Sequence, residues 1–139
     1  MEVKYKLNEG AFQPTRAYEW DVGFDLRTPY SFTVYPGGRE DVDTGVCFEI
    51  PHGFFGLVAS KSGLMVEDGS TTFGIIDSDY RGSIHGVIFN HSKHAVNFEV
   101  GDKVTQILIL PAPYFDLKEV SELSQTKRGE KGFGSSGKK

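Results

Sequence analysis

Hydrophobic and polar side chains alternate with a period of two over several short stretches of the chain. Within residues 3–7, apolar side chains alternate with lysines, which is the pattern of a strand with one buried face. The same alternation returns in three further stretches, at Phe32/Val34, Val46/Phe48/Ile50 and Val96/Phe98/Val100. These stretches predict half-buried β-strands.

Three longer apolar runs stand between the alternating stretches, at Phe54–Ala59, Ile84–Phe89 and Val104–Leu110. Continuous runs of this length are typical of strands buried on both faces. Turn-forming residues separate the runs, and the best candidate for a helix is the short segment Ser62–Asp68. Many short strands joined by regular turns predict a single all-β domain of the β-barrel or jelly-roll kind, with one short helix.

Composition limits the classes of protein that remain. The chain has 139 residues, 38% hydrophobic and 13% aromatic, which is enough for one hydrophobic core and argues against disorder. It holds no run of about 18 apolar residues, so we expect no membrane-spanning helix, and its start lacks the apolar stretch of a secretory signal. A single cysteine, Cys47, favours a reducing cytoplasm, or the nucleus or host cytoplasm for a eukaryotic or viral protein.

Charge divides the chain into two parts near Ser124. Residues 124–139 carry +4 out of a total of −4, which leaves −8 for residues 1–123. An acidic body argues against nucleic acid as the main ligand. Bulky apolar residues disappear from the tail except for Phe133. We therefore expect an all-β domain over 1–123 and a flexible tail over 124–139, which is either a solvated terminus or a segment that orders on an anion.

Two segments near strand ends carry candidate binding groups. In Asp21–Leu26, a carboxylate follows a glycine and could hold Mg²⁺ directly or through water, or it could only cap a turn. In Ala59–Leu64, hydroxyls and exposed backbone N–H groups beside Lys61 could form an anion pocket. The alternative there is an ordinary helix N-cap formed by Ser60 or Ser62.

The segment Gly74–Ile84 is the densest in ionisable groups. Asp77 follows two isoleucines, so a strand could hold its carboxylate rigidly where it activates water. Tyr80 offers a flat face for a sugar or a base, or a phenol that caps the corner. So many ionisable groups in one short turn favour a functional role.

Two further segments carry polar groups that ordinary packing does not require. Gln106 interrupts an apolar run, and a buried amide needs a partner, either across an interface or on a ligand. The glycines of Arg128–Gly137 could let backbone N–H groups surround phosphate oxygens, with Arg128 and the hydroxyls of Ser135 and Ser136 completing the cradle. The alternative is a flexible Gly/Ser tail.

Taken together and in this order, the five segments resemble the trimeric all-β dUTPases. The third segment is similar to the pattern Gly-x-Ile-Asp-x-x-Tyr-x-Gly, and the fifth to Arg-Gly-x-x-Gly-Phe-Gly-Ser-Ser/Thr-Gly. The resemblance runs from about Asp21 to Gly137. It implies a jelly-roll or β-barrel fold and a homotrimer with active sites at the subunit boundaries. It also implies hydrolysis of dUTP to dUMP and pyrophosphate with Mg²⁺.

The resemblance also implies roles for individual residues. Asp77 would orient the attacking water and accept its proton, and Asp25 would help to hold Mg²⁺, through water. The residues implied to bind the phosphate chain in the body are Lys61, Ser62, Gly63 and Gln106. Tyr80 would pack against the deoxyribose, and backbone groups around Ser83, Ile84 and Gly86 would read the uracil edge. The residues implied to close over the substrate from the tail are Arg128, Phe133, Gly134, Ser135 and Ser136, with Phe133 stacked on uracil.

Several positions depart from the family pattern. Lys61 stands where the family usually has arginine, Lys103 and Thr105 replace a common arginine and alanine, and His85-Gly86 varies the hairpin that faces the base. Two other functions fit the same segments. A dCTP deaminase of this fold would release ammonia instead of pyrophosphate, and a regulatory protein would use the nucleotide-bound tail as a switch for a partner.

Overall fold

The computed structural model describes residues 1–133, and residues 134–139 lie outside this description. Its elements follow one another as β1 (Lys4–Leu7), β2 (Gly23–Arg27), β3 (Phe32–Val34), β4 (Arg39–Glu49), β5 (Phe54–Ala59), α1 (Ser62–Asp68), β6 (Ser70–Thr71), β7 (Phe73–Ile76), β8 (Ser83–Asn90), β9 (Val96–Phe98) and β10 (Lys103–Pro111). The predicted all-β fold with one short helix is confirmed.

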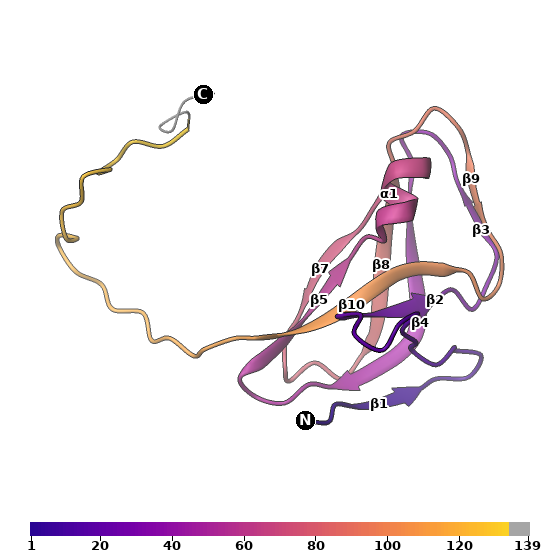
Figure 1. Cartoon of the computed structure of the whole chain (residues 1–139), viewed down its shortest axis with the longest axis horizontal. Helices are drawn as coiled ribbons and strands as arrows, with labels where there is room; N and C mark the ends of the chain where they lie inside the picture. The colour runs from indigo at the N-terminus through magenta and orange to yellow at the C-terminus, as the bar shows by residue number, and fades with distance from the viewer. Residues whose placement is uncertain (134–139) are drawn as a thin grey trace.

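Two four-stranded antiparallel sheets form the body. Their strand orders are β1-β4-β8-β6 and β2-β10-β5-β7, and β3 pairs with β9 in a small third sheet. Each four-stranded sheet ends in an edge strand at both sides, so among the described residues neither closes into a barrel. Of the two forms predicted, the open jelly-roll type is therefore the one that the chain adopts. Beyond β10 the chain leaves the body as a long arm, residues 112–133 (Figure 1).

The hydrophobic core lies between the sheets. One cluster takes side chains from both four-stranded sheets, including Leu26, Val46, Val58, Ile84 and Ile107. A second cluster joins the small sheet to the body through residues such as Val34, Val42, Ile88, Phe98 and Val104. Each fully buried side chain of this kind contributes about 1.5–3 kcal/mol. This packing fixes the strand register, and the register in turn positions the polar residues at the strand ends.

Several elements begin and end where the sequence pattern predicts. The run Phe54–Ala59 forms β5 and the segment Ser62–Asp68 forms α1. The helix stops at Gly69, whose φ of 65° and N–H bond to the carbonyl of Leu64 form a left-handed cap. The alternating or apolar pattern did not reveal β2 and β6, because glycine and polar residues interrupt these short strands, while the two isoleucines before Asp77 indicated the end of β7.

Two strands are less buried than their patterns predict. All four residues of β1 are exposed, because β1 pairs only with β4 at the edge of its sheet. β8 alternates instead of being buried on both faces, with His85 and Phe89 exposed between buried neighbours. No layer covers the second face of β8 among the described residues. The apolar run Ile84–Phe89 therefore has one buried face, and the prediction of two was wrong.

A membrane-spanning helix was not expected from the sequence. Within residues 1–133, no helix has the length and apolar character needed to cross a bilayer. The single helix, α1, covers seven residues.

Candidate active site

A polar pocket of about 270 Å³ lies where β5 passes into α1. β10 holds its parts together, because β10 pairs with β2 on one side and with β5 on the other. In this register Gln106 lies opposite both Asp25 of β2 and Ala59 of β5. The pocket is lined by Ala17, Asp21, Val22, Gly23, Asp25, Lys61, Ser62, Gly63, Lys103 and Gln106. Five residues predicted from separate segments therefore share one site.

Asp25 is the buried charged group of this pocket. Its side chain is 7% exposed, Lys61 Nζ contacts Oδ1, and Lys103 Nζ lies 2.7 Å from Oδ2. Burial alone would raise the pKa of Asp25, but hydrogen bonds and charges from Lys103 and Lys61 outweigh it, so the pKa lies below its ordinary value. The carboxylate is ionised, and it pairs with both ammonium groups. Asp21 also lines the pocket, so the two lysines and two aspartates of the lining have a formal charge of zero. The groups that can donate to an anion such as phosphate are the two ammonium groups and the backbone N–H groups at the start of α1.

Gln106 faces the pocket from the middle of β10. Its Nε2 donates to the carbonyl of Ser60 at 3.0 Å, which satisfies one of the amide's donors. Gly23 gives the amide its space, because a Cβ at that position would collide with Gln106 Oε1. The predicted need of this amide for a partner is met within the chain, and its Oε1 remains at the side of Gly23.

Ser62 and Gly63 form the exposed first turn of α1 at the pocket wall. Among the described residues, no side chain caps this helix. The Ser60 hydroxyl, the alternative cap considered from the sequence, is occupied elsewhere: it donates to the Thr72 carbonyl at 3.0 Å and accepts from the Thr72 N–H at 2.6 Å. The first-turn N–H groups are therefore left for water or a ligand.

Asp77 is exposed at the start of the loop that joins β7 to β8. The loop is braced by its own residues, since the Tyr80 hydroxyl donates to the Ser83 carbonyl at 3.1 Å and Arg81 donates to the Ser78 carbonyl at 2.7 Å. Within residues 1–133 no side-chain partner of Asp77 is found. Its carboxylate is thus held on a fixed turn and open to water. Tyr80, by contrast, already uses its hydroxyl to close the corner.

The predicted base-reading groups lie at the beginning of β8. The Ser83 carbonyl accepts from Tyr80, and the Ile84 carbonyl accepts from Thr44 Oγ1 at 2.7 Å, while the Ile84 side chain is fully buried in the core. A Cβ on Gly86 would lie 3.1 Å from Thr105 Cγ2, so a larger residue would push against β10. Both carbonyls therefore already accept from a hydroxyl of the chain itself.

The pocket and Asp77 lie at opposite ends of β5. β7 runs antiparallel to β5, with Phe73 opposite Ala59 and Ile76 opposite Gly56. Lys61 follows one end of this pair, and Asp77 follows the other. At about 3.3 Å per residue, five or six residues of strand separate them by roughly 16–20 Å. One copy of the chain does not bring Asp77 to its own pocket.

The arm leaves from the end of the sheet where Asp77 lies, because Pro111 of β10 is opposite Phe54. Within the arm, Arg128 Nε donates to the Lys131 carbonyl at 3.0 Å in a local turn. The Phe133 side chain is fully exposed. Neither Arg128 nor Phe133 is placed at the pocket. The predicted substrate contacts Gly134, Ser135 and Ser136 lie outside the described residues.

Sequence reasoning did not assign Lys103 to the site. It is the first residue of β10, and an irregularity in the β2–β10 register next to it turns its ammonium group toward Asp25. Its position directly after the Gly101-Asp102 turn was the available signal. The pocket residues Ala17, Asp21, Val22 and Gly23 were also missed as binding residues, because only the fold brings this loop beside α1.

The donor atoms of the site do not form a ready-made metal site. Among the described residues, no three His, Cys, Asp or Glu side chains cluster as metal ligands. Both oxygens of Asp25 are bonded to lysines, so a divalent ion would meet two ammonium groups on direct approach. The predicted role of Asp25 through water stays a prediction that rests on the remaining lone pairs.

The fold and the pocket define an all-β protein with a polar pocket that contains two lysines, two aspartates and a glutamine. The sequence model of the dUTPase family matches residues 10–137, and the chain belongs to this family. The deoxyuridine 5'-triphosphate nucleotidohydrolase of Variola virus is 37% identical over 132 residues, covering 95% of this chain and 90% of that protein. The Yarrowia lipolytica enzyme of the same name is 40% identical over 134 residues, with 94% and 85% covered.

Solved structures agree with this family. The Staphylococcus bacteriophage 80alpha dUTPase with dUPNHPP is 28% identical, with a TM-score of 0.91 over 98% of both chains. A G164S mutant of the same phage enzyme, with dUpNHpp, gives a TM-score of 0.90 at 27% identity. The resemblance read from five sequence segments is therefore confirmed over nearly the whole chain.

Proposed function

We propose that this chain hydrolyses dUTP to dUMP and pyrophosphate, which removes dUTP from DNA precursors and supplies dUMP. The observation that carries the proposal is the pocket in which Lys61, Lys103 and Gln106 surround the buried Asp25. The pocket offers two ammonium groups and an amide to a chain of phosphates, and membership of the dUTPase family supplies the identity of the nucleotide.

The reaction asks for positioning and charge neutralisation more than for covalent chemistry. Water attacks the α-phosphorus and forms a new P–O bond, while the bond between that phosphorus and the bridging oxygen breaks and pyrophosphate leaves. Asp77 accepts the proton of the water, a role supported by its exposed position on a braced turn. Lys61, Ser62 and Gly63 bind the phosphate chain beside Gln106.

A second copy completes each site in this proposal. The support is the roughly 16–20 Å that the β5–β7 register places between Asp77 and the pocket of the same chain. In a ring of three copies, Asp77 of one copy serves the pocket of the next.

A mixture of two variants tests this shared site directly. Co-expressed Asp77→Asn and Gln106→Ala chains should recover about one quarter of wild-type activity, because each site takes its pocket and its Asp77 from two copies drawn at random.

Two inactive parents would recover no activity if each chain contained its own complete site. An inactive mixture of assembled copies would therefore contradict the shared site. Equal expression of both chains and an unchanged oligomer mass are the controls for this measurement.

Mg²⁺ enters the proposal as part of the substrate, as the Mg²⁺ complex of dUTP. This assignment follows from the donor atoms, since the described residues include no cluster of three metal-ligating side chains. A chelator titration at fixed dUTP should remove activity in parallel with the loss of the Mg²⁺–dUTP complex. Full activity in excess chelator would contradict it.

Selection of the nucleotide is proposed to depend on the β7–β8 turn and the arm. Tyr80 excludes a 2′-hydroxyl, and backbone groups of Ser83–Gly86 read uracil. A slot that pairs a polar base edge rejects cytosine because the wrong base leaves buried groups unpaired. Arg128 and Phe133, with Gly134, Ser135 and Ser136, close over the bound nucleotide.

The experiment for the proposal is a product analysis over the four deoxynucleoside triphosphates and dUTP. Pyrophosphate from dUTP, without ammonia from any substrate, is the expected result. Ammonia from dCTP would instead identify a deaminase, and tight dUTP binding without turnover would identify a regulatory protein.

A reducing compartment, the cytoplasm, is the proposed place of action. Its support is Cys47, the single cysteine of the sequence, which is buried with Sγ 4.0 Å from Asn8 Oδ1. Immunodetection in fractions of the source cells tests this location, and recovery only in a secreted fraction would contradict it.

A further inference from the structure

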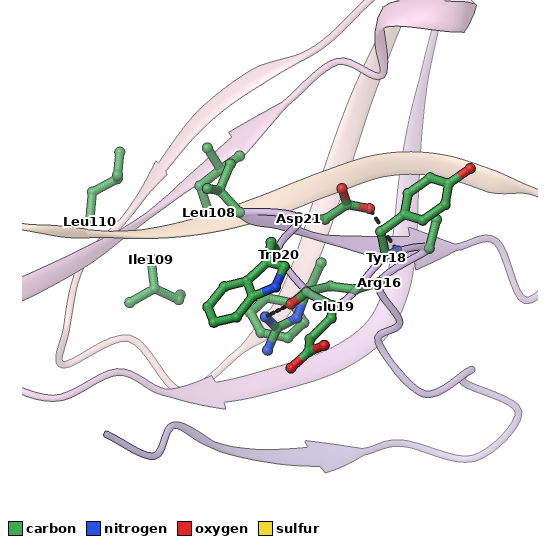
Figure 2. A pocket seen from close by; sticks show the side chains of 11 residues that line it. Arg16, Tyr18, Glu19, Trp20, Asp21, Leu108, Ile109 and Leu110 are labelled. Carbon is green, nitrogen blue, oxygen red and sulfur yellow. Dashed lines mark hydrogen bonds between the residues drawn. The ribbon is translucent and has the colours of Figure 1, made fainter.

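Two walls carry the polar groups of the phosphate pocket, and they are held in place differently. One wall is the loop of residues 16–22, which lies beside β10 in Figure 2 and supplies Asp21 to the pocket. A hydrogen bond inside this loop, from the Tyr18 N–H to Asp21 Oδ2 at 3.0 Å, holds that carboxylate in place. The other wall is Lys61 with the first turn of α1, and residues outside the pocket fix its position.

Packing alone holds α1 only loosely against the body. All seven residues of the helix are exposed or only partly buried, and Leu64 packs partly against the second core cluster. The far end of the helix is tied to the loop after β8, because the His91 N–H donates to the Gly69 carbonyl at 3.1 Å. The near end, which lies at the phosphate pocket, is tied through Ser60.

Ser60 joins the start of the α1 segment to the chain that returns along β5. β5 and β7 pair as far as Ala59 opposite Phe73, so Ser60 and Thr72 stand at the next step of the same register. At this step the Ser60 hydroxyl makes two bonds to one residue, because it donates to the Thr72 carbonyl at 3.0 Å and accepts from the Thr72 N–H at 2.6 Å. The two bonds close the segment 61–71, which contains the pocket wall and all of α1.

The backbone beside this hydroxyl is fixed from β10. Gln106 Nε2 donates to the Ser60 carbonyl at 3.0 Å, and Thr105 Oγ1 donates to the Ala59 carbonyl at 2.8 Å. β5 lies between β10 and β7 in the sheet, so Ser60 is held by its carbonyl from one neighbour and by its hydroxyl from the other. Lys61 therefore leaves the sheet from a residue that is fixed on both sides.

We propose that Ser60 is a positioning residue of the phosphate pocket. The proposal rests on the proposed function, in which Lys61 and the first turn of α1 bind the phosphate chain. Ser60 is not among the described residues that line the pocket, and it acts through its two bonds to Thr72. Without the hydroxyl, the nearest closure of the segment is the pair Ala59–Phe73. The longer loop then gives the phosphate-binding groups more conformations to lose when the substrate binds.

The test compares Ser60→Ala with Ser60→Thr, which keeps the hydroxyl, and with Ser92→Ala. Ser92 is the matched control in the loop between β8 and β9, because its hydroxyl also makes two bonds to one residue, donating to the His94 carbonyl at 2.9 Å and accepting from the His94 N–H at 3.2 Å. In Ser60→Ala, KM for dUTP should rise about fivefold, the factor that one lost hydrogen bond is worth. The kcat should stay within about twofold, because the substrate and the transition state lose the same binding. Ser60→Thr and Ser92→Ala should keep both values within about twofold of the wild type.

A calorimetric titration with inorganic triphosphate and Mg²⁺ separates the role of Ser60 from the reaction. The dissociation constant should rise about fivefold in Ser60→Ala and should equal that of the wild type in Ser92→Ala. If Ser60→Ala loses its far-UV spectrum, Ser60→Cys replaces it, because a thiol fills a similar space with weaker hydrogen bonds. A rise in both KM and the dissociation constant is then expected for Ser60→Cys.

A wild-type KM or a wild-type dissociation constant in Ser60→Ala would overturn the proposal, and so would an equal rise in Ser92→Ala or in Ser60→Thr. The failure of the proposed function looks different, because the wild-type chain would then release no pyrophosphate from dUTP. The triphosphate titration would still show in that case whether Ser60 positions the pocket. A wild type that binds neither dUTP nor triphosphate would contradict both.

Discussion

At the scale of single residues, the site depends on a carboxylate that the fold keeps charged. Asp25 is buried, yet its pKa lies below the ordinary value of 3.8, because hydrogen bonds from Lys103 and Lys61 outweigh the effect of burial. Each lysine contacts the carboxylate with a flexible, compact ammonium group, whereas an arginine would bind it through two parallel hydrogen bonds from a planar guanidinium. Removal of the Lys103 side chain should therefore lower the stability of the fold and weaken the binding of dUTP.

Lys103→Met should lower the free energy of unfolding at pH 7 by about 1.5–3 kcal/mol, since a charge-assisted hydrogen bond to a buried group is lost. It should also raise KM for dUTP more than it lowers kcat. Denaturant unfolding and steady-state kinetics measure the two effects. Lys103→Arg keeps the charge and is the control; equal loss in both variants would show that the charge is not the cause.

The lowered pKa of Asp25 also sets the direction of an acid effect. A group whose pKa is lower in the folded state stabilises the fold above its unfolded-state pKa, and this contribution is lost as pH falls through the folded-state pKa. The wild type should therefore lose stability as pH falls below about 4, and Lys103→Met should lose less over the same range. Unfolding curves at a series of pH values measure this difference, and parallel curves for the two proteins would contradict it.

Asp77→Asn should lower kcat by about 10²–10⁴-fold, because the amide no longer accepts the proton of the attacking water. Binding of a non-hydrolysable dUTP analogue should change little. Asp79→Asn in the same turn is the control, since Asp79 is also exposed but has no proposed role in catalysis. Equal kcat in the wild type and Asp77→Asn would mean that another group takes the proton.

The substitution Gly23→Ala tests whether Gln106 needs the close approach of β2. A Cβ there collides with Gln106 Oε1, so Gly23→Ala should displace the amide from its bond to the Ser60 carbonyl. Turnover should fall while the melting temperature changes by only a few degrees, about what one lost hydrogen bond costs. Activity equal to the wild type would show that Gln106 does not need this position.

At the scale of elements, the sequence pattern predicted those that have a continuous local signal. The apolar run of β5 and the small hydroxylated residues that open α1 are found at the predicted residues. Strand β2 was missed because Gly23 and Asp25 break the alternation, whereas the two isoleucines before Asp77 did indicate the end of β7. Their strand form comes from pairing with β10 and β5, which are far away in the sequence.

The site shows the same division between local and long-range information. Lys61, Ser62 and Gln106 carry a recognisable spacing, and they do meet in one pocket. The local signal for Lys103 is weak, because it consists only of its place after the Gly101-Asp102 turn. The register of β2 against β10 brings Lys103 to Asp25, and no periodicity encodes that register.

The arm is the element whose role is easiest to separate from the fold. Residues 113–133 are exposed and lie beyond β10, the last strand among the described residues, so removing residues 124–139 should leave the melting temperature and the number of copies in the oligomer unchanged. Turnover of dUTP should fall at least tenfold, because Arg128 and Phe133 no longer close over the nucleotide. Calorimetry, sedimentation and kinetics measure this, and full activity of the shortened chain would contradict a role for the arm.

At the scale of the whole molecule, the proposed function requires a second copy, because the β5–β7 register separates Asp77 from the pocket of its own chain. The body of the chain is acidic, with −8 over residues 1–123, and its tail is basic. In the pocket Lys61 and Lys103 supply the ammonium groups that can bind a phosphate chain.

The most direct test of the central claim is pyrophosphate release from dUTP by the purified full-length chain with Mg²⁺. The account predicts one dUMP and one pyrophosphate for each dUTP consumed, with no ammonia and with little or no turnover of dCTP or dTTP. A folded, assembled protein that releases no pyrophosphate from dUTP, or that releases ammonia from dCTP, would contradict it.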